Sequence, residues 1–276
     1  MAGGAALGEL GALPQRAGGK RLMDEKAVLR ELVGMSLALG SPENDYVILG
    51  EGNTSALIDE DSFFVKASGA YLADASENSF VKVRLQDALS IMDAGGLTDE
   101  QIKDALFAAC ADSANKRRPS VETTFHAFLL TLPNIRFVGH THPTAVNSLL
   151  CSVNAEEILK GRIFPDEIVY CGVEPIFIEY VDPGVQLSLT IRERARAYMD
   201  SQGCVPKVIL VQNHGLIACG ATAHEVEAIT AMCCKTFKVL AGAMIFGGIH
   251  YFTRENVERI YTRPDEHYRQ QQFRKS

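Results

Sequence analysis

Apolar side chains recur at helical spacing in several stretches of the chain. This spacing predicts a helix over residues 24–39, with Asp24 as its N-cap and apolar positions at Val28, Leu32, Met35 and Leu39. Similar patterns predict helices at 98–115, 121–131, 185–201 and 222–245. Ser120 stands directly before the 121–131 helix and is its expected cap.

Short runs rich in Val, Ile and Phe alternate with these helices and predict strands. They lie at residues 46–49, 56–58, 63–66, 135–142, 167–171, 175–179, 207–211 and 216–218. Strands in hairpins that alternate with helices predict an α/β, single-domain layered fold, with a central, mostly antiparallel sheet covered by helices. The sequence lacks the regular strand–helix alternation and the glycine fingerprint of a dinucleotide-binding fold.

Composition then narrows the class of protein. The chain has 276 residues, 27 Lys+Arg and 34 Asp+Glu, so its net charge is 27 − 34 = −7, which argues against nucleic acid as a partner. No uninterrupted apolar run approaches the roughly 18 residues that cross a bilayer, so no membrane partner is expected. We expect a flexible arm at 1–20, which does not resemble a signal peptide, a main domain at 21–250 and a helical extension at 251–276.

The cysteines indicate neither a disulfide framework nor a cysteine zinc site. Their number, seven, is odd, and no CxxC pair occurs. Most of them sit among apolar residues, which is typical of buried free thiols in a reducing compartment. The sequence therefore predicts a cytoplasmic protein.

Two histidines end the predicted 135–142 strand. Side chains on a strand alternate faces, so His140 and His142 point the same way, with their Cα atoms about 7 Å apart. Two imidazoles at that spacing can bind one metal ion, and Pro143 places them where the strand ends. The alternative is a pair of ordinary histidines at a half-exposed edge.

His214 offers a third ligand, because it lies in the turn Gln212-Asn-His-Gly215 after another apolar strand. Three histidine ligands leave an open position on a zinc-like ion, the arrangement of catalytic rather than structural sites. A turn histidine that donates to a carbonyl is the alternative. The remaining histidines show no pairing and are expected to be packing or surface residues: His126, His224, His250 and His267.

A carboxylate and two polar turns complete the candidate chemistry. Glu122 opens the 121–131 helix, where the helix dipole favours a carboxylate by about 0.3–1 kcal/mol. Near a metal, the same carboxylate would be a ligand or a general base. The turns Gly52-Asn-Thr-Ser55 and Ser68-Gly69 offer N–H groups and hydroxyls that suit an anion, although ordinary hairpin turns carry the same groups.

Together these segments resemble the class II aldolase/adducin family, which includes the fuculose- and rhamnulose-phosphate aldolases. The resemblance covers roughly residues 24–245 and rests on five motifs in order: Gly52-Asn-Thr-Ser55, Ser68-Gly69, Ser120-Val-Glu122, His140-Thr-His142 and Gln212-Asn-His-Gly215. Within the family, the chain is most similar to the aldolase part of a bifunctional rhamnulose-phosphate aldolase/dehydrogenase.

The resemblance implies a role for each motif. His140, His142 and His214 would bind a divalent metal, Zn²⁺ or else Mn²⁺ or Co²⁺, and Glu122 would be the general base. The residues that would hold the substrate's phosphate are Asn53, Ser55, Ser68, Gly69 and Ser120. The reaction would be retro-aldol cleavage of a ketose 1-phosphate or related hydroxyketone through a metal-stabilised enediolate. The family forms homotetramers with sites between subunits, so a neighbour's tyrosine, which the sequence does not place, would act as the acid.

One position departs from the family pattern. Sugar-phosphate aldolases of the family commonly carry a second hydroxyl where this chain has Val121, so one phosphate donor is lost. This leaves open a metal-dependent decarboxylase of a small hydroxy or aromatic acid, or a non-catalytic adducin-like interaction module. The three histidines argue against the module, because a purely structural protein has no use for an open metal site.

Overall fold

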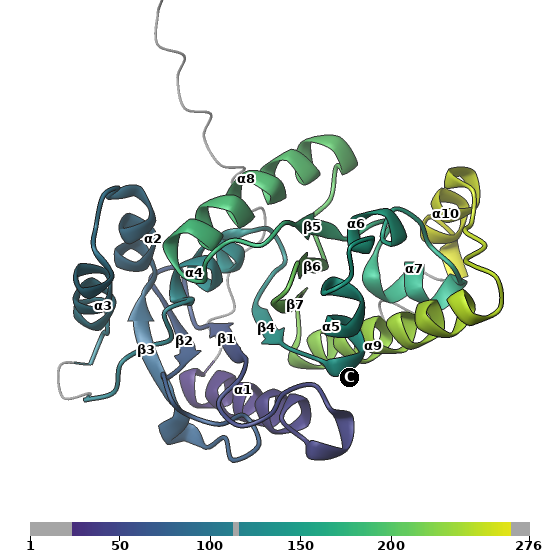
Figure 1. The fold of residues 1–276 in the computed structure, drawn as a ribbon. Helices are drawn as coiled ribbons and strands as arrows, with labels where there is room; N and C mark the ends of the chain where they lie inside the picture. Colours follow the sequence, from purple (N-terminus) through teal and green to yellow (C-terminus); the bar gives the residue numbers. More distant parts are fainter. Residues whose placement is uncertain (1–23, 113–115, 266–276) are drawn as a thin grey trace, which may run out of the picture.

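The computed structural model describes residues 24–112 and 116–265, and these form helices packed on both faces of one sheet (Figure 1). The strand order is β3-β2-β1-β4-β7-β6-β5. The strands are β1 (Asn53–Leu57), β2 (Ser62–Lys66), β3 (Phe80–Arg84), β4 (Phe137–Thr141), β5 (Ile176–Ile178), β6 (Val208–Val211) and β7 (Gly215–Gly220). Neighbouring strands are antiparallel except β5 and β6, which are parallel. The predicted α/β layered fold is confirmed.

The helices lie between these strands along the chain. They are α1 (Glu25–Leu39), α2 (Leu85–Asp93), α3 (Asp99–Ala108), α4 (Thr123–Thr131), α5 (Thr144–Leu150), α6 (Ala155–Ile158), α7 (Pro165–Cys171), α8 (Val185–Gln202), α9 (Ala223–Ile245) and α10 (Arg254–Tyr261), with 3₁₀ turns η1 (Pro42–Asn44) and η2 (Glu77–Ser79). Asp24 caps α1 as predicted, and its carboxylate accepts a hydrogen bond from the Lys26 N–H.

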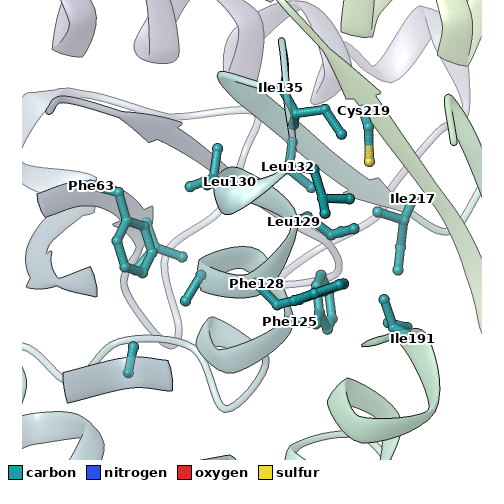
Figure 2. Close-up of a cluster of buried hydrophobic side chains, with 14 of the residues drawn as sticks. Phe63, Phe125, Phe128, Leu129, Leu130, Leu132, Ile135, Ile191, Ile217 and Cys219 are labelled. Carbon is teal, nitrogen blue, oxygen red and sulfur yellow. The ribbon is translucent and has the colours of Figure 1, made fainter. Parts of the chain in front are cut away.

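Alternation along the strands builds two hydrophobic layers. Phe63 and Val65 of β2 face α2, α4 and α8, whereas Phe64 faces α1 and α9 on the other side of the sheet (Figure 1). Figure 2 shows the first layer, in which Phe125 of α4 packs with Ile217 of β7 and neighbouring apolar residues. Burying each such side chain contributes about 1.5–3 kcal/mol to the free energy of unfolding.

Helix α9 is the one helix among the described residues that is long and apolar enough to cross a membrane. Its buried face, with Val226, Ile229 and Phe237, packs on β4 and β7 and against α1, α5 and α7. The core helix of a globular protein can have the same length and composition, and 39% of the apolar window of α9 is buried inside the protein.

Several predicted elements are wrong or shifted. Residues 46–49 form a loop instead of a strand, with Ile48 and Leu49 exposed by 61% and 73%, because this apolar run finds no partner in the sheet. The predicted strand 167–171 is helix α7, which begins at Pro165, a residue whose fixed φ suits the first turn of a helix. Strand β3 and helix α2 were not predicted, and β1 begins within the predicted turn, at Asn53.

The ends of the chain are only partly described. The predicted arm at 1–20 lies outside the described residues, and so does the extension beyond residue 265, although α10 lies within the predicted extension 251–276. All seven cysteines are described and are free thiols, as predicted; five are buried, Cys204 is partly buried and Cys151 is exposed.

Candidate metal centre

The three candidate ligands meet at one end of the sheet because of how β1, β4 and β7 pair. His140 of β4 lies between Asn53 of β1 and Ile217 of β7 in the antiparallel register. His142 follows two residues later on the same face, and His214 lies in the β6–β7 turn, directly before β7 begins. The strand pairing therefore joins two motifs that are far apart in the sequence.

Two glycines allow the backbones to approach closely at this end. Gly52 has a φ of 67°, and a Cβ atom there would lie 2.5 Å from the His140 carbonyl oxygen. A Cβ atom at Gly215 would lie 2.5 Å from the Thr141 oxygen and 2.8 Å from Cδ2 of His142. Neither position accepts a side chain without moving the candidate ligands.

The ring nitrogens of the three histidines converge. Nε2 of His140 lies 3.0 Å from Nε2 of His142 and 3.2 Å from Nε2 of His214. Nitrogen ligands at about 2.0–2.1 Å from a tetrahedral zinc ion lie about 3.3–3.4 Å apart, close to the observed separations. The three side chains are the one cluster of metal-binding groups found in the described part of the chain.

Electrostatics keep these rings in the form that binds metals. Burial, reinforced by the neighbouring histidines, lowers the pKa of His140 and of His142 from 6.5 to about 3, so both imidazoles are neutral near pH 7. Nδ1 of His140 lies 3.0 Å from the Leu216 carbonyl oxygen, which accepts a hydrogen bond from the Nδ1–H group and so leaves a lone pair on Nε2. Lone pairs that face one another at 3 Å repel unless a cation lies between them, so this donor set fits a metal ion.

The outer ring nitrogens of the other two histidines have different surroundings. Nδ1 of His142 lies 3.9 Å from Oε1 of Glu51, a carboxylate partner of the type that orients metal-binding histidines. Nδ1 of His214 is buried, and no described residue provides a hydrogen-bond partner for it. The His214 carbonyl accepts a hydrogen bond from the Asn147 amide, which fixes the turn.

Glu122 lies beside two of the three histidines, His140 and His214. It is 5% exposed and occupies the N-cap position of α4, which was predicted for Ser120, although its side chain makes no capping hydrogen bond. Its oxygens lie 3.5 Å from Nε2 of His140 and 3.5 Å from Nε2 of His214. Its Oε2 accepts a hydrogen bond of 2.7 Å from the Asn53 amide, whereas its buried Oε1 has no hydrogen-bond partner among the described residues. An unpartnered carboxylate oxygen beside these ring nitrogens also fits a cation.

Four of the five predicted anion-binding residues form two neighbouring pairs. Asn53 and Ser120 lie beside Glu122, since the Asn53 amide also donates to Oγ of Ser120 at 3.2 Å. Ser68 and Gly69 are exposed in the turn after β2, and this turn runs beside the Ser120 segment because Ala67 bridges Pro119. The structure thus brings four of the five residues to neighbouring backbone segments.

Ser55 has different surroundings. Its side chain is completely buried, and its hydroxyl lies 2.7 Å from Nδ1 of His126. We therefore assign Ser55 a supporting role, as a partner of His126, in place of the predicted phosphate binding. His126, expected to be a packing or surface residue, also bonds to Asn53, and its Nε2 lies 2.5 Å from the Asn53 Oδ1.

The sequence-based prediction also missed Lys66. This residue ends β2 and is 3% exposed, and its ammonium group donates to the backbone oxygens of Gly50 and Ala70, which flank the two polar turns. Burial lowers the pKa of Lys66 from 10.5 to about 8, although the charge of Glu122 acts in the opposite direction. A lysine inside a strand that is otherwise buried was the available signal.

Val121 lines a cavity. Its side chain is 41% exposed, and the residue lines a cavity of about 350 Å³ together with residues of α2, α3 and α8. The side chains around it are mainly apolar, with Met92 and Leu189 among them.

Comparisons with known proteins agree with this geometry. A profile of the Class II Aldolase and Adducin N-terminal domain matches residues 30–240. The chain is 32% identical over 204 residues to the uncharacterized oxidoreductase YuxG of Bacillus subtilis, a match that covers 71% of this chain and 27% of that protein. The chain therefore spans about a quarter of this relative.

Two solved structures share the fold. An L-fuculose 1-phosphate aldolase superposes with a TM-score of 0.64 at 19% identity, over 88% of this chain and 98% of the other. YgbL of Escherichia coli, a putative aldolase/epimerase/decarboxylase, gives 0.63 at 18% identity, over 86% and 99%. The profile match and the three-histidine cluster support an enzyme of the class II aldolase type with a divalent metal site. The chain belongs to the class II aldolase and adducin family.

Proposed function

We propose that the chain is a divalent-metal-dependent lyase that performs retro-aldol cleavage of a ketose 1-phosphate or related hydroxyketone. The observation that carries the proposal is the position of Nε2 of His140, 3.0 Å from Nε2 of His142 and 3.2 Å from Nε2 of His214, with the Glu122 carboxylate 3.5 Å from His140 and His214. Zn²⁺ is the proposed metal, because three histidines suit it and leave a position open for substrate.

In this proposal the chain's own residues bind the metal and move the proton. His140, His142 and His214 hold the ion, which when bound polarises the substrate's oxygens and offsets the negative charge that develops as the carbon–carbon bond breaks. Glu122 moves a proton at the substrate carbon, and the Asn53 amide keeps that carboxylate in place.

The anionic end of the substrate is assigned to the polar turns. Asn53 and Ser120 offer an amide and a hydroxyl beside Glu122, and Ser68-Gly69 offers exposed backbone N–H groups on the neighbouring turn. Lys66 supports this arrangement, since it donates to the backbone oxygens of Gly50, which precedes the first turn, and of Ala70, which follows the second.

We further propose that the chain forms a homotetramer with its sites between subunits. Ile48 and Leu49 are exposed next to Glu51, the carboxylate that faces His142, and a neighbouring subunit would cover this apolar loop. A neighbour's tyrosine would supply the general acid. Light scattering that gives the mass of a single chain would contradict this assembly.

The reaction is tested by product analysis with zinc-loaded protein and a panel of ketose 1-phosphates. Release of dihydroxyacetone phosphate and an aldehyde, abolished by His140→Ala, would support the proposal. No cleavage of any substrate by protein that carries one zinc ion per chain would contradict it.

A metal-dependent decarboxylase is the second candidate, and Val121 favours it. An apolar side chain at this position removes a phosphate donor and suits a carboxylate or neutral substrate. The same zinc-loaded protein would then release carbon dioxide from a hydroxy or aromatic acid. A non-catalytic module predicts no bound metal and no turnover.

A further inference from the structure

A second cluster of polar side chains lies buried beside the candidate ligands. His126 of α4 is completely buried, with Nδ1 2.7 Å from Oγ of Ser55 and Nε2 2.5 Å from Oδ1 of Asn53. The Asn53 amide nitrogen lies 2.7 Å from Oε2 of Glu122. A continuous row of hydrogen bonds therefore runs from Ser55 to the carboxylate of the site.

The chemistry of the groups fixes the direction of every bond in this row. The carboxylate of Glu122 is an acceptor, so the NH₂ group of Asn53 faces it and the Asn53 oxygen faces His126. That oxygen accepts, so the His126 proton is on Nε2. Nδ1 is then an acceptor, and the Ser55 hydroxyl donates to it.

We propose that His126 is a positioning residue of the metal centre: it holds the Asn53 amide in the orientation in which its N–H points at Glu122. The opposite orientation would turn the Asn53 oxygen towards the carboxylate and leave two acceptors facing each other. The consequence for proton transfer by Glu122 rests on the proposed function, whereas the orientation of Asn53 does not.

A packing role is the competing explanation. The His126 ring stacks on Phe125 with centroids 4.5 Å apart and planes at 23°, among the apolar residues of α4. An aromatic ring of similar size would serve that role as well as histidine does. A glutamine, in contrast, has both an N–H donor and an oxygen acceptor and can reproduce the two polar contacts.

The first test needs no variant and no substrate. With ¹⁵N-labelled histidine in the full chain as purified, and again after Zn²⁺ is added, nitrogen chemical shifts report which ring nitrogen carries the proton. We expect a neutral His126 with its proton on Nε2 in both samples. A proton on Nδ1 would overturn the proposal, whatever reaction the protein catalyses.

The second test compares His126→Gln with His126→Phe. We expect the Asn53 side-chain N–H that faces Glu122 to be protected from hydrogen exchange in wild type and in His126→Gln, and to lose protection in His126→Phe. Equal protection in the phenylalanine variant would show that packing alone orients Asn53. Ser55→Ala is a smaller change and should weaken the protection of this N–H less than His126→Phe does. An unprotected N–H in wild type would also contradict the proposal.

A kinetic test then connects the orientation to catalysis. In zinc-loaded protein, His126→Phe should lower kcat about 10- to 100-fold, the usual range for a residue that supports a metal site. His126→Gln should recover most of that loss. If wild type shows no turnover, the proposed function fails while the two NMR tests still decide the role of His126.

Discussion

Two clusters of polar side chains, each containing histidine, lie next to each other on the α4 face of the sheet, and they differ in how their polar atoms are partnered. Along the row from Ser55 through His126 to Asn53, each donor faces an acceptor. In the trio around His140, Nε2 of His140 lies 3.0 Å from Nε2 of His142 and 3.2 Å from Nε2 of His214. The saturated cluster holds its neighbours in place, whereas the trio offers ring nitrogens that suit a cation.

Removing one of the candidate metal ligands should have the largest effect, on both metal affinity and turnover. His140→Ala takes away the central nitrogen of the trio, so metal affinity should fall by more than the roughly 10- to 100-fold typical of losing a supporting residue, and turnover should be abolished. Calorimetric metal titration measures the affinity. His224→Ala, at an exposed histidine on α9, is the matched control and should bind metal like wild type.

Glu122→Gln should separate metal binding from proton transfer. Glutamine keeps the size of the side chain and an oxygen that can accept from Asn53, so metal affinity should change only a few-fold. A neutral amide does not accept the proton, so turnover should fall by about 10²–10⁴-fold. Steady-state kinetics on zinc-loaded protein provide the measurement, and full turnover would remove Glu122 from its assigned role.

Gly215→Ala should disturb the trio through the backbone. The new Cβ atom would lie 2.5 Å from the Thr141 oxygen, so the free energy of unfolding should fall by about 1–3 kcal/mol, with weaker metal binding. Gly34 in the middle of α1 has no neighbouring atom within 4 Å of its added Cβ and is the control. Gly34→Ala should raise the free energy of unfolding by about 0.5–1 kcal/mol. Equal effects at both positions would contradict the close packing at Gly215.

The smallest expected effect is an acid sensitivity of the saturated cluster. Burial lowers the pKa of His126 from 6.5 to about 3, so below pH 6.5 the unfolded chain takes up a proton that the folded chain does not. The contribution of His126 to stability is therefore present above about pH 6.5 and is lost as the pH falls towards 3, by at most about 1.4 kcal/mol per pH unit.

Urea unfolding of metal-free protein at a series of pH values measures this effect. Wild type should lose stability more steeply on acidification than His126→Gln, which has no ring to protonate. His224→Gln, at an exposed position, should follow wild type. Parallel curves for wild type and His126→Gln would mean that His126 takes up its proton equally in both states.

The two clusters also differ in how far the sequence could predict them. His140 and His142 were found because a strand puts alternate residues on one face, and His214 because it ends another apolar strand. His126 gave no such signal, since its partners Ser55 and Asn53 lie 71 and 73 residues away and meet it only through the packing of α4 on β1.

Short apolar runs that suit more than one structure explain the errors in the predicted elements. The run Ile168-Val169-Tyr170 is apolar enough for either a buried strand or a helix, and only Pro165 indicated a helix start. Val47, Ile48 and Leu49 form an apolar run that stays outside the sheet, and two of them are exposed. The proposed assembly of copies would cover them, and a single chain's pattern does not encode that.

The most direct test is the metal content of the full chain after incubation with Zn²⁺ and removal of excess ion. Elemental analysis should give about one zinc ion per chain for wild type, and near zero for His140→Ala, His142→Ala and His214→Ala. Far less than one ion per chain in folded wild type, or one ion that all three variants retain, would contradict a metal centre at this trio.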